Sequence, residues 1–164
     1  MRVKTLSIQN PQSYLVACGA KNVENRTWKT DYRGWIYIHS SGSHVFDTPE
    51  EDDFPDGLFD LPDDSEELAR ITRCTGVLWD QIFRHYGTNP DSAQAEWDKA
   101  TREHGYYMQH GCIVGRAQLV DIVQDSPSIF AEPGANHWIF ENAELFDRPI
   151  VNVVGRLRLY DVEI

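Results

Sequence analysis

The first forty residues alternate short segments with strand and helix signatures, and this alternation constrains the fold most. Residues 3–8 alternate apolar and polar side chains, as a half-buried strand does. Asn10 and Pro11 follow as an N-cap candidate and a proline at the first helical position. Gly19 stands where a helix C-cap favours positive φ. We therefore expect a two-turn helix over residues 11–18, with short strands on either side.

The rest of the chain extends this pattern of short strands. Further strands are expected at residues 24–28, 34–39, 112–123, 138–140, 149–154 and 155–162. Gly115 lies inside a β-branched segment, which indicates a bulge or bend. Helical periodicity predicts one helix over residues 65–86, interrupted near Gly76, and a second over residues 89–104.

Short strands with few helices between them close most simply as a small, mostly antiparallel barrel. The chain has 164 residues, a length that suits one domain burying about 68–70% of its unfolded surface. We expect an α+β fold in which residues 1–164 form a single domain. Its β-barrel would carry flanking helices, and residues 47–109 would form an acidic loop plus helical insertion.

The net charge of −11 is unevenly distributed along the chain. Residues 1–46 hold six basic and two acidic residues, which gives +4, whereas residues 47–67 hold eleven acidic residues and no Lys or Arg. Residues 68–164 hold nine basic and thirteen acidic residues. The amino-terminal part is thus a basic surface within an acidic protein, which suits a ligand that carries phosphate. The acidic segment is a solvated loop, which we favour, a lid over the basic surface, or a docking site for a basic protein.

Several classes of protein find no support in the sequence. The widely spaced Cys18, Cys74 and Cys112 indicate free thiols in a reducing compartment. No apolar run approaches the roughly 20 residues of a membrane helix, and the amino terminus lacks the apolar region of a signal peptide. We therefore expect a cytoplasmic protein with no membrane partner. Histidine spacing and motif content support neither a metal site nor a cofactor, and the oligomeric state stays open.

Residues 19–26 read Gly-x-Lys-x-x-Glu-x-Arg and place two cations around one carboxylate. Glu24 and Arg26 are two residues apart on an expected strand, so their side chains share a face. Arg26 can contact a phosphate or a base edge through paired donors, and Glu24 can accept hydrogen bonds from an exocyclic amine. Lys21 can bind phosphate or act as a base. The structural alternative is a helix stop followed by a surface ion pair that contributes under about 1 kcal/mol.

Other candidate binding residues lie close to this segment. Trp28 offers a surface on which a base can stack. Lys29 and Arg33 extend the basic surface, although a turn before the next strand would also select polar residues there. His39 and Ser40 end a strand that we expect to approach the same cleft, where they could contact phosphate. For His39 the alternative is a partly buried polar residue of the core.

The order of these segments resembles the ASCH domain of the PUA-like superfamily. The similar segments are LSIQNP, GAKNVENRTW, YRGWIYIHSS, GCIVGRAQLVDIV and HWIFENAELFDRPIVNVVGRLRLY. The family signature G-x-K-x-x-E-x-R is matched at Gly19, Lys21, Glu24 and Arg26. The resemblance covers about residues 3–46 and 110–162 and leaves 47–109 as an insertion. It implies a β-barrel whose signature-lined cleft binds RNA, single-stranded nucleic acid or a nucleotide.

The same resemblance implies an enzymatic alternative. Some members of the family are described as ribonucleases, and some small members hydrolyse acylated cytidines. In those hydrolases a threonine, the proposed nucleophile, occupies the position of Glu24. A hydrolase of modified nucleosides or a ribonuclease would here have to use Lys21 and Glu24 to activate water. A protein-interaction module built on the acidic insertion is the third hypothesis.

Overall fold

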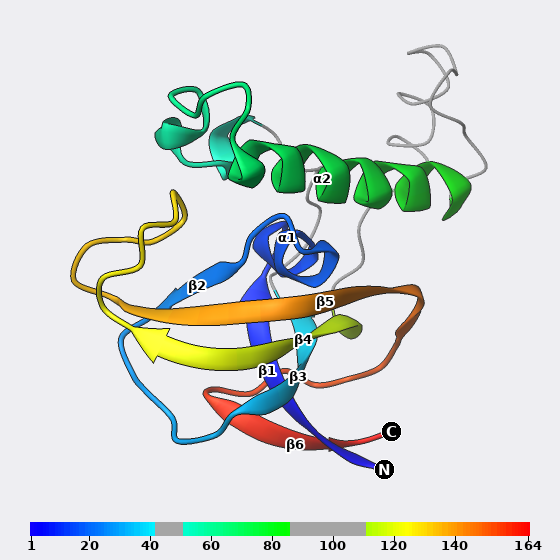
Figure 1. The fold of residues 1–164 in the computed structure, drawn as a ribbon. Helices are drawn as coiled ribbons and strands as arrows, with labels where there is room; N and C mark the ends of the chain where they lie inside the picture. Colours follow the sequence, from blue (N-terminus) through cyan, green and yellow to red (C-terminus); the bar gives the residue numbers. More distant parts are fainter. Residues whose placement is uncertain (42–50, 86–110) are drawn as a thin grey trace.

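The computed structural model describes residues 1–41, 51–85 and 111–164 (Figure 1). Within these residues six strands form one mixed sheet, accompanied by two α-helices and two short 3₁₀ helices. The strands are β1 (Arg2–Gln9), β2 (Val23–Arg26), β3 (Gly34–Ser41), β4 (Cys112–Val123), β5 (Asn136–Ile150) and β6 (Leu159–Glu163). The helices are α1 (Gln12–Cys18), the 3₁₀ helices Glu51–Asp53 and Asp56–Leu58, and α2 (Glu66–His85). The fold is α+β.

The sheet has two open edges. Its strands follow the order β2-β5-β4-β3-β1-β6, and within this order β1 and β3 are parallel while the other pairs are antiparallel. The pairing of β1 with β6 runs from Arg2 to Leu6. On that side of β1, residues 7–9 have no strand partner among the described residues. The predicted antiparallel majority is confirmed. The pairing does not close the sheet into the predicted barrel, because it ends at β2 and β6.

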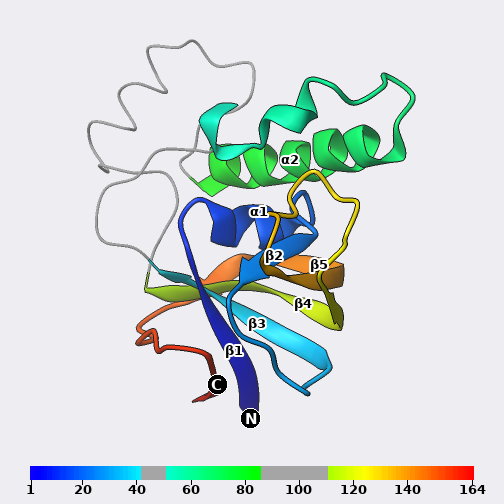
Figure 2. The same ribbon diagram turned by 90° about the vertical axis from the view of Figure 1, so that its left-hand side faces the viewer.

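One face of the sheet carries the main hydrophobic core. Figures 1 and 2 show α1 lying on this face and α2 crossing above α1. The core combines buried side chains of the sheet and of both helices, among them Leu6, Ile8, Leu15, Val16, Ile36, Ile38, Leu78, Ile82, Leu119 and Trp138. The other face buries a smaller cluster around Val3, Tyr37 and Ile113. Both faces of the sheet are therefore partly covered, so apolar side chains occur on both sides of the strands.

The two predicted helices that lie in the described residues are confirmed. α1 ends at Gly19, whose φ of 91° is left-handed, as its C-cap position requires. Its N-cap is Pro11 rather than Asn10. α2 runs without interruption through Gly76, so the predicted break is wrong, and Ser65 Oγ accepts the Leu68 N–H at 3.3 Å in the first turn. The helix predicted over residues 89–104 lies outside the described residues.

The strand predictions are confirmed in the middle of the chain and wrong near its end. The register of β4 shifts between Ile113 and Gly115, which confirms the predicted irregularity. β5 is much longer than the predicted 138–140 and runs to Ile150, so no separate strand covers 149–154. The next strand begins only at Leu159. Asn152 and Arg158 adopt positive φ values of 60° and 62°, which lie outside the extended region of regular strands.

The described part of the acidic segment also packs against the protein. Phe54, Leu58 and Leu61 contact a cluster formed by Val23, Ile71 and Phe130. The side chain of Gln12 donates to the Asp53 carbonyl oxygen at 3.0 Å. Apolar contacts therefore hold residues 51–61 against the protein. This packing differs from the solvated loop that we favour from the sequence.

The three cysteines are free thiols, as predicted. Burial raises the pKa of the Cys18 thiol to about 12 and that of the Cys112 thiol to about 11. Both thiols are therefore protonated near neutral pH and unreactive. Among the described residues, no helix combines the length and the apolar character needed to cross a membrane, and no group of three or more His, Cys, Asp or Glu could hold a metal ion.

Gly115 is the position where we expect the sheet to tolerate a side chain least. A Cβ there would collide with the Glu144 carbonyl oxygen and lie 2.9 Å from the Ala17 Cβ. We expect Gly115→Ala to lower the free energy of unfolding by about 1–3 kcal/mol, measured by chemical denaturation. Gly76→Ala is the control, because a Cβ at this helical position meets nothing within 4 Å, and it should stabilise by about 0.5–1 kcal/mol. Wild-type stability of Gly115→Ala would contradict this packing.

Candidate functional site

The signature segment, residues 19–26, forms the turn from α1 into β2. The Lys21 N–H donates to the Leu15 carbonyl oxygen at 3.0 Å, which ends the helix and directs the chain into the strand. β2 then pairs with β5 along one of its edges. The opposite edge has no strand partner among the described residues, so the signature lies at an edge of the sheet.

This free edge of β2 lies beside the end of β1, where residues 7–9 pair with β3 on one side and with no described strand on the other (Figure 2). We call the gap between residues 7–9 of β1 and residues 24–26 of β2 the seam. Arg26 Nη2 donates to the Ser7 carbonyl oxygen at 2.9 Å across it. A side chain thus connects the two strands in the place where backbone pairing would have closed a barrel.

The charged side chains of the signature meet at the seam. Lys21 Nζ lies 3.5 Å from Glu24 Oε2, and Arg26 Nε lies 3.8 Å from Glu24 Oε1. Lys21 and Glu24 are each only 9% exposed. The predicted carboxylate between two cations is therefore formed in the structure. The separations are those of ion pairs rather than short hydrogen bonds, which leaves hydrogen-bonding capacity in the cluster.

Two buried atoms of this cluster have no hydrogen-bond partner among the described residues. They are Glu24 Oε2, an acceptor, and Arg26 Nε, a donor. Most buried polar atoms in proteins are paired, so such a group calls for a functional explanation. Lys21, by contrast, is fixed, because its Nζ donates to Gln12 Oε1 at 2.9 Å. The cluster thus retains one acceptor and one donor that form ion pairs but no hydrogen bond.

A cavity of about 570 Å³ opens at the seam, and we call it the cleft. Its lining combines the end of β1, β2 and two loops: Ser7, Ile8, Gln9, Gln12, Glu24, Asn25, Arg26, Trp28, Ser41, Arg156, Leu157 and Arg158. This volume lies in the range of roughly 300–1,000 Å³ that small-molecule sites occupy. The cleft is therefore large enough for one nucleotide.

Trp28 forms an aromatic wall of the cleft. Its ring packs edge-on against Trp138, with centroids 4.6 Å apart. Trp138 Nε1 also donates to the Trp28 carbonyl oxygen at 3.2 Å, which fixes the backbone at this point. Trp28 is half-buried and lines the cleft. A rigid ring of this kind can stack on a base.

A scan against protein-family models matches the ASCH domain to residues 6–150. The chain belongs to the ASCH domain family. The match begins within β1 and ends at the last residue of β5, so it covers the signature and most of the sheet. A search of curated proteins found no match to the chain.

Five of the predicted binding residues of this ASCH domain lie outside the cleft lining: Lys21, Lys29, Arg33, His39 and Ser40. Lys21 instead lines a neighbouring cavity of about 390 Å³. Lys29 is exposed in the loop between β2 and β3. Arg33 donates through Nη1 to the carbonyl oxygens of Thr30 and Tyr32, both at 2.9 Å, and its Nη2 lies 3.8 Å from Asp121. These contacts shape the loop. A role of Lys29 and Arg33 in binding stays a prediction that the cleft geometry does not support.

His39 is buried below the cleft, in a chain of hydrogen bonds. Its Nε2 lies 2.9 Å from the Val153 carbonyl oxygen, and its Nδ1 lies 3.1 Å from Ser7 Oγ, which in turn lies 2.9 Å from Tyr160 Oη. Because a carbonyl only accepts, Nε2 carries the proton and Nδ1 accepts from Ser7. The Tyr160 hydroxyl then donates to Ser7. Both ring nitrogens of His39 are thus occupied within the protein, and its contact with a ligand stays a prediction.

Ser40 is fully buried and fixes the start of α1. Its hydroxyl donates to Asn10 Oδ1 and lies 2.9 Å from Ser13 Oγ. Ser13 Oγ donates to the same Asn10 oxygen at 2.8 Å. This network attaches the turn before α1 to β3. Ser41, the next residue, lines the cleft instead.

Nine of the twelve lining residues are not among those that the sequence predicts, and the most informative of them are Gln12, Arg156 and Arg158. Gln12 links Lys21 to the acidic segment, because it accepts from the lysine and donates to the Asp53 backbone. The two arginines come from the loop between β5 and β6. One signal was available for them, since residues 151–158 carry two arginines and no acidic residue.

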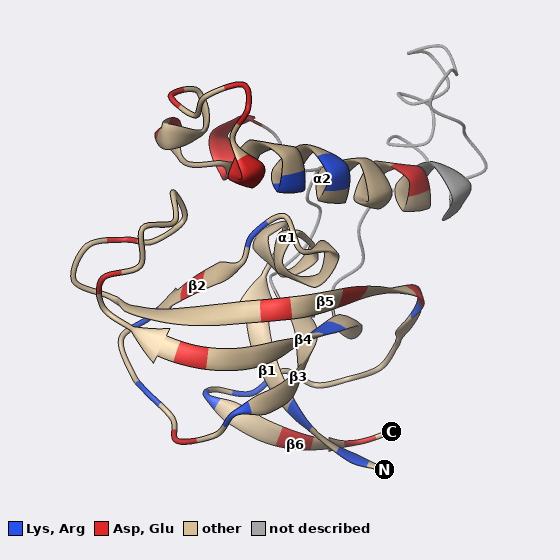
Figure 3. Ribbon diagram, viewed as in Figure 1, with Lys and Arg blue, Asp and Glu red and all other residues tan. Residues whose placement is uncertain are grey.

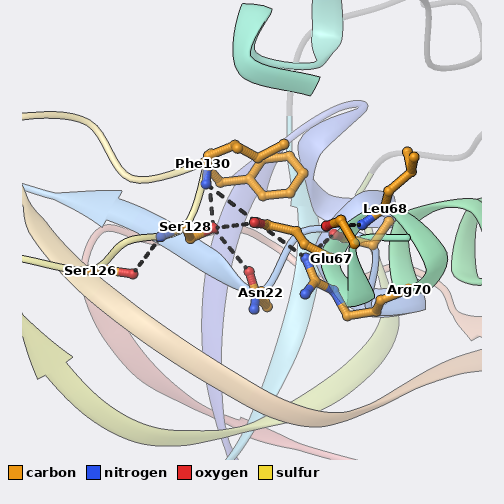
Figure 4. Close-up of polar contacts among 10 residues, drawn as sticks. Asn22, Glu67, Leu68, Arg70, Ser126, Ser128 and Phe130 are labelled. Atoms are coloured by element: carbon orange, nitrogen blue, oxygen red, sulfur yellow. Dashed lines mark hydrogen bonds and ion pairs between the residues drawn. The ribbon is translucent and has the colours of Figure 1, made fainter. Parts of the chain in front are cut away.

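A larger cavity, of about 910 Å³, lies between α2 and the loop that joins β4 to β5. Figure 4 shows the contacts there: Ser128 Oγ donates to Glu67 Oε1 at 3.1 Å and lies 3.3 Å from Asn22 Oδ1. Arg70 Nη2 lies 3.7 Å from the same Glu67 oxygen. These bonds attach the loop to α2 and to the residue after Lys21. We assign the function to the smaller cleft, because the unpaired signature atoms lie there.

The His39 hydrogen-bond chain predicts that stability depends on pH. Burial lowers the pKa of His39, so the folded state favours the neutral ring. The stabilisation is present above the ordinary pKa of about 6.5 and is lost as the pH falls through the lowered value. We expect the melting temperature of the wild type to fall more steeply below pH 6.5 than that of His39→Gln. The two proteins differ only at residue 39, so a constant difference between the two curves would contradict this assignment.

Proposed function

We propose that this ASCH domain binds RNA, single-stranded nucleic acid or a nucleotide in the cleft. The observation that carries the proposal is the buried Glu24, held between Lys21 and Arg26 with unpaired polar atoms beside an open cavity. The family supports it, since RNA binding is generally proposed for ASCH domains. The cavity size supports it as well, because one nucleotide fits the cleft.

Each signature residue has a chemical role in this proposal. Glu24 accepts a hydrogen bond from an exocyclic amine of a base, and Arg26 donates from Nε to a neighbouring acceptor on the base or to a phosphate oxygen. Lys21 holds the carboxylate in position and adds positive charge. Trp28 stacks on the base. Single-stranded nucleic acid suits this arrangement, because its base edges are free.

The distribution of charge also supports an anionic ligand. Figure 3 shows acidic residues gathered on the 3₁₀ helices and the first turn of α2, while Lys and Arg occupy the loop between β2 and β3 and the start of β1. The lining of the cleft itself includes three arginines and one carboxylate. Local potential controls the approach of a charged ligand more than net charge does.

We propose further that residues 1–164 form a single domain. Leu78 and Ile82 of α2 belong to the same core as α1 and the sheet, which supports this view. The predicted barrel differs from the observed sheet at the seam. Here the charged cluster occupies the gap that a β1–β2 pairing would have filled.

Arg26 provides the direct test of the binding proposal. We expect Arg26→Ala to weaken binding of a short single-stranded RNA about tenfold and to reduce the salt slope of the affinity by about one. Arg33→Ala is the matched control, because Arg33 lies on the adjacent loop outside the cleft and is 40% exposed. Titrations at several salt concentrations measure both effects, with melting curves to confirm folding. Equal affinity of Arg26→Ala and wild type would refute the assignment of the cleft.

Glu24→Gln tests whether Glu24 binds the exocyclic amine of a base and whether it takes part in hydrolysis. The amide keeps the shape of the side chain and removes its charge, so we expect weaker binding of nucleotides with an exocyclic amine. The same nucleotides without that amine should bind no more weakly than before. The hydrolase hypothesis is measured with acylated cytidine and short RNAs. Turnover by the wild type that Glu24→Gln abolishes, with binding retained, would establish catalysis.

A further inference from the structure

The loop between β5 and β6 brings two cations to the cleft from the far end of the chain. Arg156 and Arg158 line the cavity together with Leu157. Without them the charged lining residues would be Glu24 and Arg26, whose charges cancel. The net positive charge of the lining therefore comes from this loop. We call residues 155–158 the C-terminal flap.

Both ends of the flap are fixed to the protein. Before it, the Val153 N–H donates to the Gly111 carbonyl oxygen at 3.1 Å, and the Val153 carbonyl accepts from His39. After it, Leu159 pairs with Leu6 as the first residue of β6. The flap backbone lies close to the sheet, since a Cβ on Gly155 would be 2.8 Å from His39 Cε1. The position of the flap over the cleft is thus determined by the fold.

The flap side chains, in contrast, have few partners. Leu157 is 93% exposed, which is unusual for a large apolar side chain. Neither Arg156 nor Arg158 forms an ion pair within the described residues. Arg158 has a φ of 62°, a left-handed conformation that arginine rarely adopts. Such strain is concentrated at functional sites, where surrounding structure maintains it.

Arg158 lies over the exposed side of Trp28. Its Cζ is 5.4 Å from the ring centroid, the separation of a cation–π contact. A planar base inserted between the guanidinium and the indole needs about 7 Å, two contact distances of about 3.5 Å. Arg158 therefore has to move outward by less than the width of one atom. Its side chain already occupies one wall of a slot whose other wall is Trp28.

We infer that the flap is the phosphate-binding part of the cleft and that Arg158 and Trp28 form the two walls of a slot for a nucleobase. Arg156, the neighbouring cation, binds the phosphate attached to that nucleotide. The ligand class is accordingly a phosphorylated nucleotide, free or within a single strand, rather than a nucleoside or a free base. This inference rests on the proposed function of the cleft.

Arg158→Gly tests whether the arginine serves binding or folding. Glycine adopts positive φ without strain, so we expect this variant to melt at or above the wild-type temperature. The probes are the four ribonucleoside 5′-monophosphates, the matching nucleosides and a mixed-sequence RNA decamer. We expect Arg158→Gly to bind the monophosphates and the decamer about tenfold more weakly. Wild-type affinity of this variant would overturn the slot.

Arg156→Ala tests the phosphate contact separately. We expect it to weaken binding of the monophosphates about tenfold and to leave the nucleosides unchanged. Arg158→Lys should keep the salt dependence of the decamer but lose affinity, because ammonium stacks poorly on a base. Arg148→Ala, an exposed arginine near the end of β5, is the matched control and should bind as wild type.

The outcomes separate this inference from the proposed function. If Arg26→Ala loses binding while Arg156→Ala and Arg158→Gly retain it, the cleft binds nucleotides and the flap has no part in it. If Arg26→Ala also binds as wild type, both proposals fail. Equal affinity of the wild type for nucleosides and their monophosphates would overturn the assignment of phosphate to the flap.

Discussion

The contact between Arg26 and β1 is the constraint on which the rest of this structure depends. Within the described residues the sheet has two open edges, and one of them, β2, lies beside the end of β1 that pairs with β3 alone. Where a barrel would close by backbone hydrogen bonds, a guanidinium donates to the Ser7 carbonyl oxygen. The resulting gap between β1 and β2 contains the cleft, and Glu24 is buried beside it between Lys21 and Arg26.

The surrounding structure serves to hold this gap in one geometry. Asn10, Ser13 and Ser40 fix the start of α1 to β3, and Gly19 ends the helix so that Lys21 turns toward Glu24. On the other side, Glu67 and Ser128 attach α2 to the turn that precedes β2. A buried ion cluster is costly unless its partners are held in place, and these uncharged networks supply that order.

Much of the fold follows from local sequence patterns, and the failures occur where local patterns end. The helix limited by Pro11 and Gly19 and the irregular strand around Gly115 were predicted because each depends on neighbouring residues. The barrel closure that the sequence predicts is absent from the strand pairing of the described residues, because pairing between distant strands has no local signal. The segment 151–158 contains apolar residues typical of a strand, yet tertiary contacts place it over His39 as a loop.

The sequence alone determined the chemistry of the signature, since spacing of two on a strand puts Glu24 and Arg26 on one face whatever the fold. It also determined that a basic surface exists in an acidic chain. Only the tertiary structure decided which residues complete the site. Arg156 and Arg158 lie about 130 positions from the signature along the chain, and His39 and Ser40 are turned toward internal hydrogen bonds. The physical reason is that a cleft between two strand edges is assembled by long-range packing, which local periodicity does not encode.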